Sequence, residues 1–179
     1  MRFTFVDRVL ELEPGVRITT VKALSLAEEY LADHFPRFPV MPGVLMLEAM
    51  TQAGAWLVRA SEDFAHSIVV LKEARNIKYA DFVGPGQVLT VTAEILKEEE
   101  RETQIKAQGM LGDRLAVSGR LVLQRFNLAD ERPDMSATDS YVKQHMRELL
   151  SLLYQPAPAA IATQRSATVE TLSASEPIR

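Results

Sequence analysis

The chain has 179 residues, 47% of them hydrophobic and 25% charged, which is typical of one globular domain. Its net charge of −4 argues against nucleic acid as the main partner, because phosphate binding usually needs a basic surplus. The absence of cysteine excludes disulfides and thiolate chemistry. No apolar run nears the roughly 18 residues of a membrane span, and no signal-peptide core follows the N-terminus, so we expect a cytoplasmic protein without a membrane span.

The N-terminal residues predict a β-hairpin followed by a short helix. Residues 3–12 and 16–23 alternate between apolar and polar side chains, as half-buried strands do, and residues 13–15 between them form a turn signal. Ser25 with Glu28 three residues later matches a capping box, so a short helix is expected to begin at Ser25.

A proline-rich loop and a long apolar helix occupy the centre of the sequence. The loop, residues 34–43, contains three prolines, which fix backbone φ angles and prevent a regular helix. A helix is expected from Pro42 to Ala60, since proline is favoured at the first helical position. Residues 44–58 are apolar nearly all round, which predicts burial, and their main polar positions share one face: Glu48, Thr51 and Gln52.

The second half of the sequence is rich in predicted strands. Extended segments are expected at residues 68–74, 76–79, 88–96, 103–111 and 115–126. Glycine-containing turns at residues 84–86 and 112–113 separate some of them, and the second of these turns is a hairpin signal. Strands that follow one another through short turns form an antiparallel sheet. Together with one buried helix, they predict an α+β fold.

The composition changes after Phe126. Residues 127–135 are interpreted as a polar linker and residues 137–154 as an amphipathic helix, with Ser136 and Asp139 as its capping pair. Residues 155–179 are rich in Ala, Ser, Thr and Pro, which predicts a disordered tail. The expected organisation is a folded domain over residues 1–126, a linker and helix over 127–154, and a tail over 155–179.

Three residues around the central helix carry candidate chemistry. Glu48 lies within the apolar helix, where desolvation would raise its pKa and let it donate a proton; alternatively, it sits on an exposed edge or pairs with an arginine. His34 is a candidate general base or a structural histidine. Gly43 falls in the first helical turn, where free N–H groups can stabilise charge on a carbonyl oxygen, or it simply starts the helix. No His/Asp/Glu spacing predicts a metal site.

The segment from His34 to Gln52, HFPRFPVMPGVLMLEAMTQ, resembles the signature of bacterial 3-hydroxyacyl-acyl-carrier-protein dehydratases. Residues 5–9 resemble that family's opening strand, and residues 76–79 followed by 84–86 resemble its second landmark. The resemblance covers roughly residues 3–126 and implies the hot-dog fold, a long antiparallel sheet wrapped around one buried central helix. It also implies a lyase of fatty-acid synthesis that converts a 3-hydroxyacyl thioester to the trans-2-enoyl thioester and water without a cofactor.

The resemblance implies roles for individual residues. His34 would remove the C2 proton, Glu48 of the partner subunit would protonate the departing hydroxyl, and the Gly43 N–H would polarise the thioester carbonyl. The expected substrate-binding residues are Phe35, Gly43, Val44 and Gln52, of which Gln52 also supports the acid. Glutamate rather than aspartate at position 48 favours the plain dehydratase over the relative that also isomerises its product. The implied assembly is a homodimer with shared active sites, which can form a hexamer of three dimers.

Several features depart from the family pattern and suggest a divergent branch in a specialised lipid or polyketide pathway. Arg37-Phe38 replaces the usual Gly-Arg, and Ala80-Asp81 replaces a basic pair that attracts the acidic carrier protein. The usual N-terminal helix is not predicted, and residues from 127 onward have no counterpart. The added helix is either peripheral, or packs across the dimer, or covers the acyl tunnel.

Two other functions stay open on the sequence alone. One is a hot-dog thioesterase, and the other is a non-catalytic acyl-binding or assembly subunit. The carrier of the thioester, an acyl carrier protein or coenzyme A, also stays open.

Overall fold

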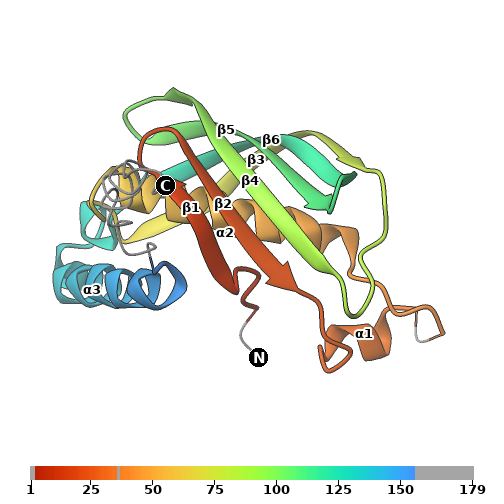
Figure 1. Ribbon diagram of the computed structural model, residues 1–179. Coiled ribbons are helices and arrows are strands. Elements are labelled where there is room, and N and C mark those ends of the chain that lie inside the picture. The colour runs from red at the N-terminus through yellow and green to blue at the C-terminus, as the bar shows by residue number, and fades with distance from the viewer. Residues whose placement is uncertain (1–2, 36, 156–179) are drawn as a thin grey trace, which may run out of the picture.

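The computed structural model describes residues 3–35 and 37–155, and in them one antiparallel sheet curves around a long helix (Figure 1). The strands are β1 (Arg8–Glu13), β2 (Arg17–Ala23), β3 (Ile68–Tyr79), β4 (Val88–Glu98), β5 (Glu102–Leu111) and β6 (Arg114–Phe126). They lie in the order β1-β2-β4-β5-β6-β3, and every neighbouring pair is antiparallel. Helix α2 (Gly43–Ser61) lies inside the curve. The predicted α+β hot-dog arrangement is confirmed.

The strands form where apolar and polar residues alternate in the sequence. In β4 the fully buried positions are every second residue: Leu89, Val91 and Ala93. The predicted two-residue turn joins β5 to β6, and Gly112 in it adopts a φ of +57°, which glycine reaches without strain. The two extended segments predicted between residues 68 and 79 form one strand, β3, with an irregularity around Asn76.

Helix α2 is buried because most of its surface is apolar. Its residues with 2% exposure or less include Met46, Ala49, Met50, Ala53 and Leu57. Gly54 allows the sheet to come close, since a Cβ atom there would lie 2.9 Å from the Ile105 side chain. The predicted helix is confirmed to within a residue at each end, but Pro42 is its N-cap rather than its first residue.

The N-terminal strand is shorter than predicted. Strand β1 begins at Arg8 rather than Phe3, because the backbone before it bonds to a helix side chain. The Gln52 Oε1 atom accepts from the Phe5 N–H at 2.8 Å, and the Gln52 Nε2 atom donates to the Phe3 carbonyl at 2.9 Å. The first described residues therefore lie against α2.

The predicted capping box at Ser25 is wrong. The Ser25 hydroxyl accepts from the Ala27 N–H at 3.1 Å within a turn, and the Glu28 carboxylate binds the Lys22 Nζ atom at 2.7 Å. Because Glu28 is engaged by a buried lysine of β2, helix α1 (Tyr30–Asp33) begins only after it.

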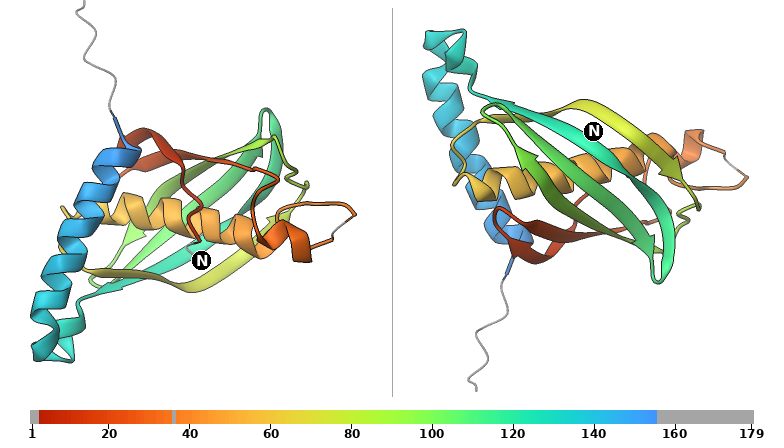
Figure 2. Two further views of the ribbon diagram at one scale, coloured as in Figure 1. Left: turned by 90° about the horizontal axis from the view of Figure 1, so that it is seen from below. Right: turned by 90° about the horizontal axis from the view of Figure 1, so that it is seen from above.

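Helix α3 (Ser136–Leu153) crosses α2 near the C-terminal end of α2 (Figure 2). Four of its residues pack against the core: Met146, Leu149, Leu150 and Leu153. Two short 3-10 turns, η1 (Leu128–Asp130) and η2 (Pro133–Met135), occupy the predicted linker. The predicted helix is confirmed, and the predicted tail lies outside the described residues beyond position 155.

Asp139 anchors α3 instead of capping it. The helix begins at Ser136 itself, so the predicted Ser136–Asp139 capping pair is wrong. Asp139 is only 4% exposed, and its carboxylate accepts hydrogen bonds from the Ser67 hydroxyl and, at 2.9 Å each, from the N–H groups of Leu128 and Ala129. Burial raises the pKa of Asp139, but these hydrogen bonds outweigh it and hold the pKa below its usual value.

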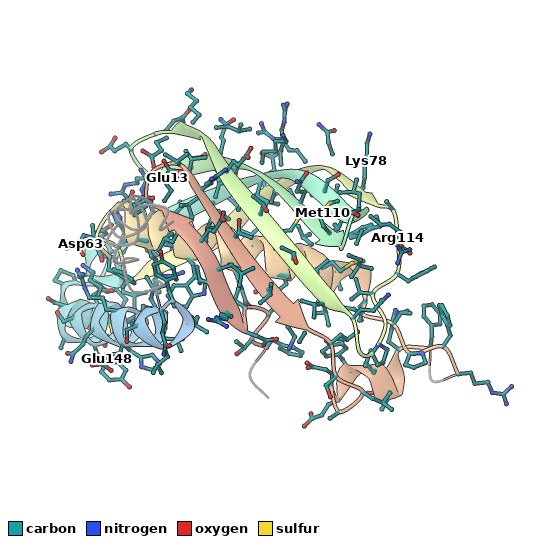
Figure 3. All side chains as sticks on the ribbon, viewed as in Figure 1. Glu13, Asp63, Lys78, Met110, Arg114 and Glu148 are labelled. Carbon is teal, nitrogen blue, oxygen red and sulfur yellow. The ribbon has the colours of Figure 1, made fainter. Side chains whose placement is uncertain are left out.

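A second tether fixes α3 to the end of α2. The Arg147 guanidinium binds the side chain and the carbonyl of Asp63, which lies beside α3 in Figure 3. The same guanidinium lies 4.8 Å from the centre of the Phe64 ring. Helix α3 is therefore joined to the sheet-and-helix core by polar contacts as well as apolar ones.

Among residues 3–35 and 37–155, no helix is long and apolar enough to cross a membrane. The same residues contain no group of three or more His, Cys, Asp or Glu side chains that could hold a metal ion.

Candidate active site

His34 lies at the start of a loop whose shape is fixed by backbone hydrogen bonds. It is the C-cap of α1, and its side chain is half-buried. The Phe38 N–H donates to the Phe35 carbonyl at 2.7 Å, and the Met41 N–H donates to the Val83 carbonyl at 2.8 Å. Phe35 has a φ of +48°, a strained conformation for a bulky residue, and its ring centre lies 4.3 Å from that of His34. The loop therefore restrains the imidazole.

His34 and Gly43 line the same cavity, which has a volume of about 510 Å³. The rest of its wall is mostly apolar and includes Phe35, Met46, Tyr79 and Phe82. Gly43 begins α2, where the backbone N–H has no partner inside the helix and the helix dipole adds positive potential. The cavity thus combines a proton acceptor with a donor for a carbonyl oxygen.

Glu48 and Gln52 lie together on another face of α2, as their spacing predicted. The Gln52 Nε2 atom donates to the Glu48 Oε1 atom at 2.9 Å, and Gln52 is itself held by the backbone of Phe3 and Phe5. Glu48 is half-buried and lines a second cavity, of about 360 Å³. This hydrogen bond is consistent with the predicted support of Glu48 by Gln52.

The histidine and the glutamate of one chain do not line the same cavity. Glu48 is five residues after Gly43, which turns it by about 140° around the helix axis. The Glu48 cavity is bordered by residues 69–71 of β3, which is the edge strand of the sheet. A substrate in the His34 cavity would thus not meet Glu48 of the same chain within that cavity.

Val44 is the predicted site residue with the least structural support. Its side chain is 67% exposed and lines neither of the two cavities. Its role in substrate binding stays a prediction that depends on a second subunit.

The rim of the His34 cavity is aromatic rather than basic. Phe38 and Phe82 are both more than half exposed, and their ring centres lie 5.6 Å apart, edge to face. Asp81, at the position of an expected basic residue, binds Arg114. Figure 3 shows Arg114 and Lys78 at this end of the sheet.

Comparison with known proteins decides the family. Residues 1–124 match the FabA-like domain family. The chain belongs to this family. Its relatives include two enzymes named 3-hydroxyacyl-acyl-carrier-protein dehydratase FabZ. That of Ruminiclostridium cellulolyticum is 38% identical over 119 residues, 66% of this chain and 84% of the relative. That of Levilactobacillus brevis is 38% identical over 117 residues, 65% of this chain and 79% of the relative.

Solved structures show the same fold at low identity. The dehydratase heterocomplex ApeI:P from Xenorhabdus doucetiae matches with a TM-score of 0.60 and 17% identity, over 75% of this chain and 90% of that one. Cj0977, a sigma28-regulated virulence protein from Campylobacter jejuni, matches with a TM-score of 0.54 and 13% identity, over 70% and 80% of the two chains. This FabA-like domain is therefore a divergent hot-dog protein.

The family match ends before α3, yet α3 contributes to the Glu48 cavity. Met146, Leu149 and Leu153 line it together with Trp56 and Arg59 of α2. Arg59 was not among the predicted site residues, although the sequence carries a signal for it: it is a cation within a mainly apolar helix, as Glu48 is an anion within it. Burial lowers the pKa of Arg59 to about 10. In this chain, the second cavity therefore contains a charged side chain, Arg59, that lies outside the His34–Gln52 motif.

Proposed function

We propose that this chain is a 3-hydroxyacyl thioester dehydratase that acts on acyl chains carried by acyl carrier protein, in fatty-acid or related lipid synthesis in the cytoplasm. The observation that carries the proposal is the shared cavity of His34 and Gly43, with the acid Glu48 held by Gln52 on the next face of the same helix. Relatives named as dehydratases of that substrate, 38% identical to this chain, support the same reaction.

The reaction divides between a base, a donor and an acid. His34 takes the C2 proton while the electron pair of that C–H bond moves toward the thioester carbonyl. The Gly43 N–H stabilises the negative charge that grows on the carbonyl oxygen. The electron pair then forms the C2–C3 double bond as the C3–O bond breaks, and Glu48 gives its proton to the leaving hydroxyl, which departs as water. The thioester itself acidifies the C2 proton, so no step requires a cofactor.

The active site is shared between two subunits in a homodimer. The outer edge of β3 has no strand partner among the described residues, and an open edge can pair with the same edge of a second copy. Such pairing brings the Glu48 face of one subunit toward the other subunit. A hexamer of three dimers would leave this catalytic unit unchanged.

Hydration of a crotonyl thioester, the reverse reaction, tests the function. Loss of the conjugated-enoyl absorbance without release of free thiol is expected, on crotonyl carrier protein and more weakly on crotonyl coenzyme A. Release of thiol would identify a thioesterase instead, and neither signal would identify a non-catalytic subunit. Equal rates on the two carriers would contradict the proposed carrier protein.

A further inference from the structure

The second cavity extends along α2 from Glu48 to Arg59. Arg59 lies three helical turns beyond Glu48, which is about 16 Å along the axis. The walls between these two charges are mainly apolar and come from α2, β3 and α3: Ala55, Trp56, Val69, Leu71, Met146 and Leu149. The cavity thus has an acid near one end, a cation near the other and an apolar middle.

Arg59 has no anionic partner within residues 3–35 and 37–155. Its Nε atom is buried and makes no hydrogen bond there. Its guanidinium lies 5.8 Å from the centre of the Trp56 ring, and Trp56 is only 7% exposed. Glu48 is the one acidic residue that lines the described cavity. The Nε side of the half-buried guanidinium therefore packs against Trp56 without a counter-charge among the described residues.

The acidic residues that follow Arg59 in the sequence are engaged elsewhere. Glu62 binds Arg125 and, at 2.8 Å, the His66 Nδ1 atom. Asp63 binds Arg147 of α3. Neither carboxylate is free to neutralise Arg59, so within residues 3–35 and 37–155 the site is open to the carboxylate of a bound molecule.

We propose that this cavity binds the distal part of the acyl chain and that Arg59 binds a carboxylate at the far end of it. The substrate class is then a 3-hydroxyacyl thioester with an ω-carboxyl group, an inference that rests on the proposed function. Arginine suits this task, because its planar guanidinium pairs with both oxygens of a carboxylate and stays charged at neutral pH. The apolar walls suit the methylene chain between the thioester and the carboxylate.

Helix α3 makes the cavity selective for length as well as for charge. Its residues Met146, Leu149 and Leu153 form a wall where α3 crosses the C-terminal half of α2 (Figure 2). A chain that is too short leaves Arg59 unsatisfied, and one that is too long carries its carboxylate past the guanidinium, while α3 closes the side of the cavity. We therefore expect one preferred chain length among the ω-carboxyl substrates.

Paired substrates on one carrier test the inference. Each trans-2-enoyl thioester, from hexenoyl to tetradecenoyl, is compared with the analogue of the same length that ends in a carboxylate. The expected result is a higher kcat/KM for the ω-carboxyl member at the preferred length. In the Arg59→Gln protein the ratio of the two kcat/KM values falls about tenfold to a hundredfold, as expected for loss of a hydrogen-bonded charge partner. Arg120→Gln, which changes an exposed arginine of β6, leaves the ratio unchanged.

Binding gives a readout that does not depend on turnover. Trp56 is the single tryptophan of the chain, so its fluorescence reports on this cavity. Saturable quenching by linear monocarboxylates, absent with the primary alcohols of equal length and absent in Arg59→Gln, supports the proposal. This measurement separates the two claims: if no enoyl thioester is hydrated, the proposed function fails, and the fluorescence still decides whether Arg59 binds a carboxylate.

Three results would overturn the inference. One is equal kcat/KM for the two members of every pair in the unmodified protein, a comparison that needs no variant. Another is an Arg59→Gln protein that is folded but keeps the ratio of the unmodified protein. The third is dissociation of the oligomer on Arg59→Gln, measured by sedimentation, because it would assign the guanidinium to a carboxylate of a second copy.

Discussion

The cavities at the two ends of α2 are formed by different parts of the chain. At its N-terminal end, His34 and Gly43 come from one continuous segment that matches the family, and they line one cavity. At its C-terminal end, the cavity wall combines α2 with α3, which lies beyond the matched residues 1–124. The first cavity holds His34 and Gly43, whereas the second has Glu48 near one end, mainly apolar walls and the cation Arg59 near the other. We infer that chemistry is shared with the family and that substrate choice is specific to this chain.

The largest expected effect is at the N-terminal end. His34→Ala should lower kcat for crotonyl-thioester hydration about a hundredfold to ten-thousandfold, the usual contribution of a general base. His145→Ala is the matched control, since His145 lies on α3 and lines neither cavity. Both proteins should keep the circular dichroism of the unmodified chain. Full activity of a folded His34→Ala protein would show that His34 is not the general base and that its role at this end of α2 is structural.

Mixing two inactive proteins tests whether the two faces of α2 meet across subunits. Glu48→Gln should lose activity as His34→Ala does, because the amide cannot donate the acid's proton. In a mixed dimer, one of the two sites regains both the base and the acid. Up to half of the activity of the unmodified dimer should therefore return per mixed dimer. Verified subunit exchange without any recovery would place both groups in a site within one chain.

Loss of the α3 anchor should have a smaller effect, on stability and on the second cavity. Asp139→Asn should lower the midpoint of thermal unfolding by several degrees, because the amide cannot accept all the hydrogen bonds that the carboxylate accepts. The control is Asp134→Asn on η2, where the carboxylate is exposed. Thermal unfolding followed by circular dichroism measures both variants. Equal midpoints would show that the hydrogen bonds of Asp139 do not stabilise the fold.

The pH dependence of that stability has a defined sign. The pKa of Asp139 is lower in the folded protein than in the unfolded chain, so its contribution is fully present above the unfolded pKa of about 3.9. The contribution is lost as pH falls through the folded pKa. The difference in unfolding midpoint between the unmodified protein and Asp139→Asn should therefore be constant near neutral pH and shrink in acid. A difference that grows in acid would contradict the assigned role.

The predictable parts of the molecule are those set by local pattern. The alternation of apolar and polar residues predicted β4, β5 and β6. A long apolar segment with a proline before it predicted α2. The link between Glu48 and Gln52 was predictable because residues four apart on a helix are neighbours. In these cases the contact partner is within a few residues or on the adjacent strand.

The wrong predictions concern side chains whose partners are far away in the sequence. Asp139 follows Ser136 at capping-box spacing, but its carboxylate is held by Ser67, which is 72 residues away in the sequence. The backbone of Phe3 and Phe5 pairs with Gln52 rather than with a strand. Arg59 lines a cavity whose other wall is α3, a helix that is far away in the sequence. Sequence spacing alone cannot distinguish such contacts from local ones.

The smallest expected effect is at Gly43, where the helix start meets the wall of the first cavity. In Gly43→Ala the new Cβ would lie 3.1 Å from the Tyr79 ring, which is half exposed and can shift by a few tenths of an ångström. The backbone N–H remains, so we expect a loss of only a few-fold in kcat/KM, carried by KM as the ring moves into the cavity. Gly84→Ala is the control, because its Cβ would make an ordinary contact at 3.6 Å. A loss as large as that of His34→Ala would mean that the position of this N–H, and not proton transfer alone, limits the reaction at this end of α2.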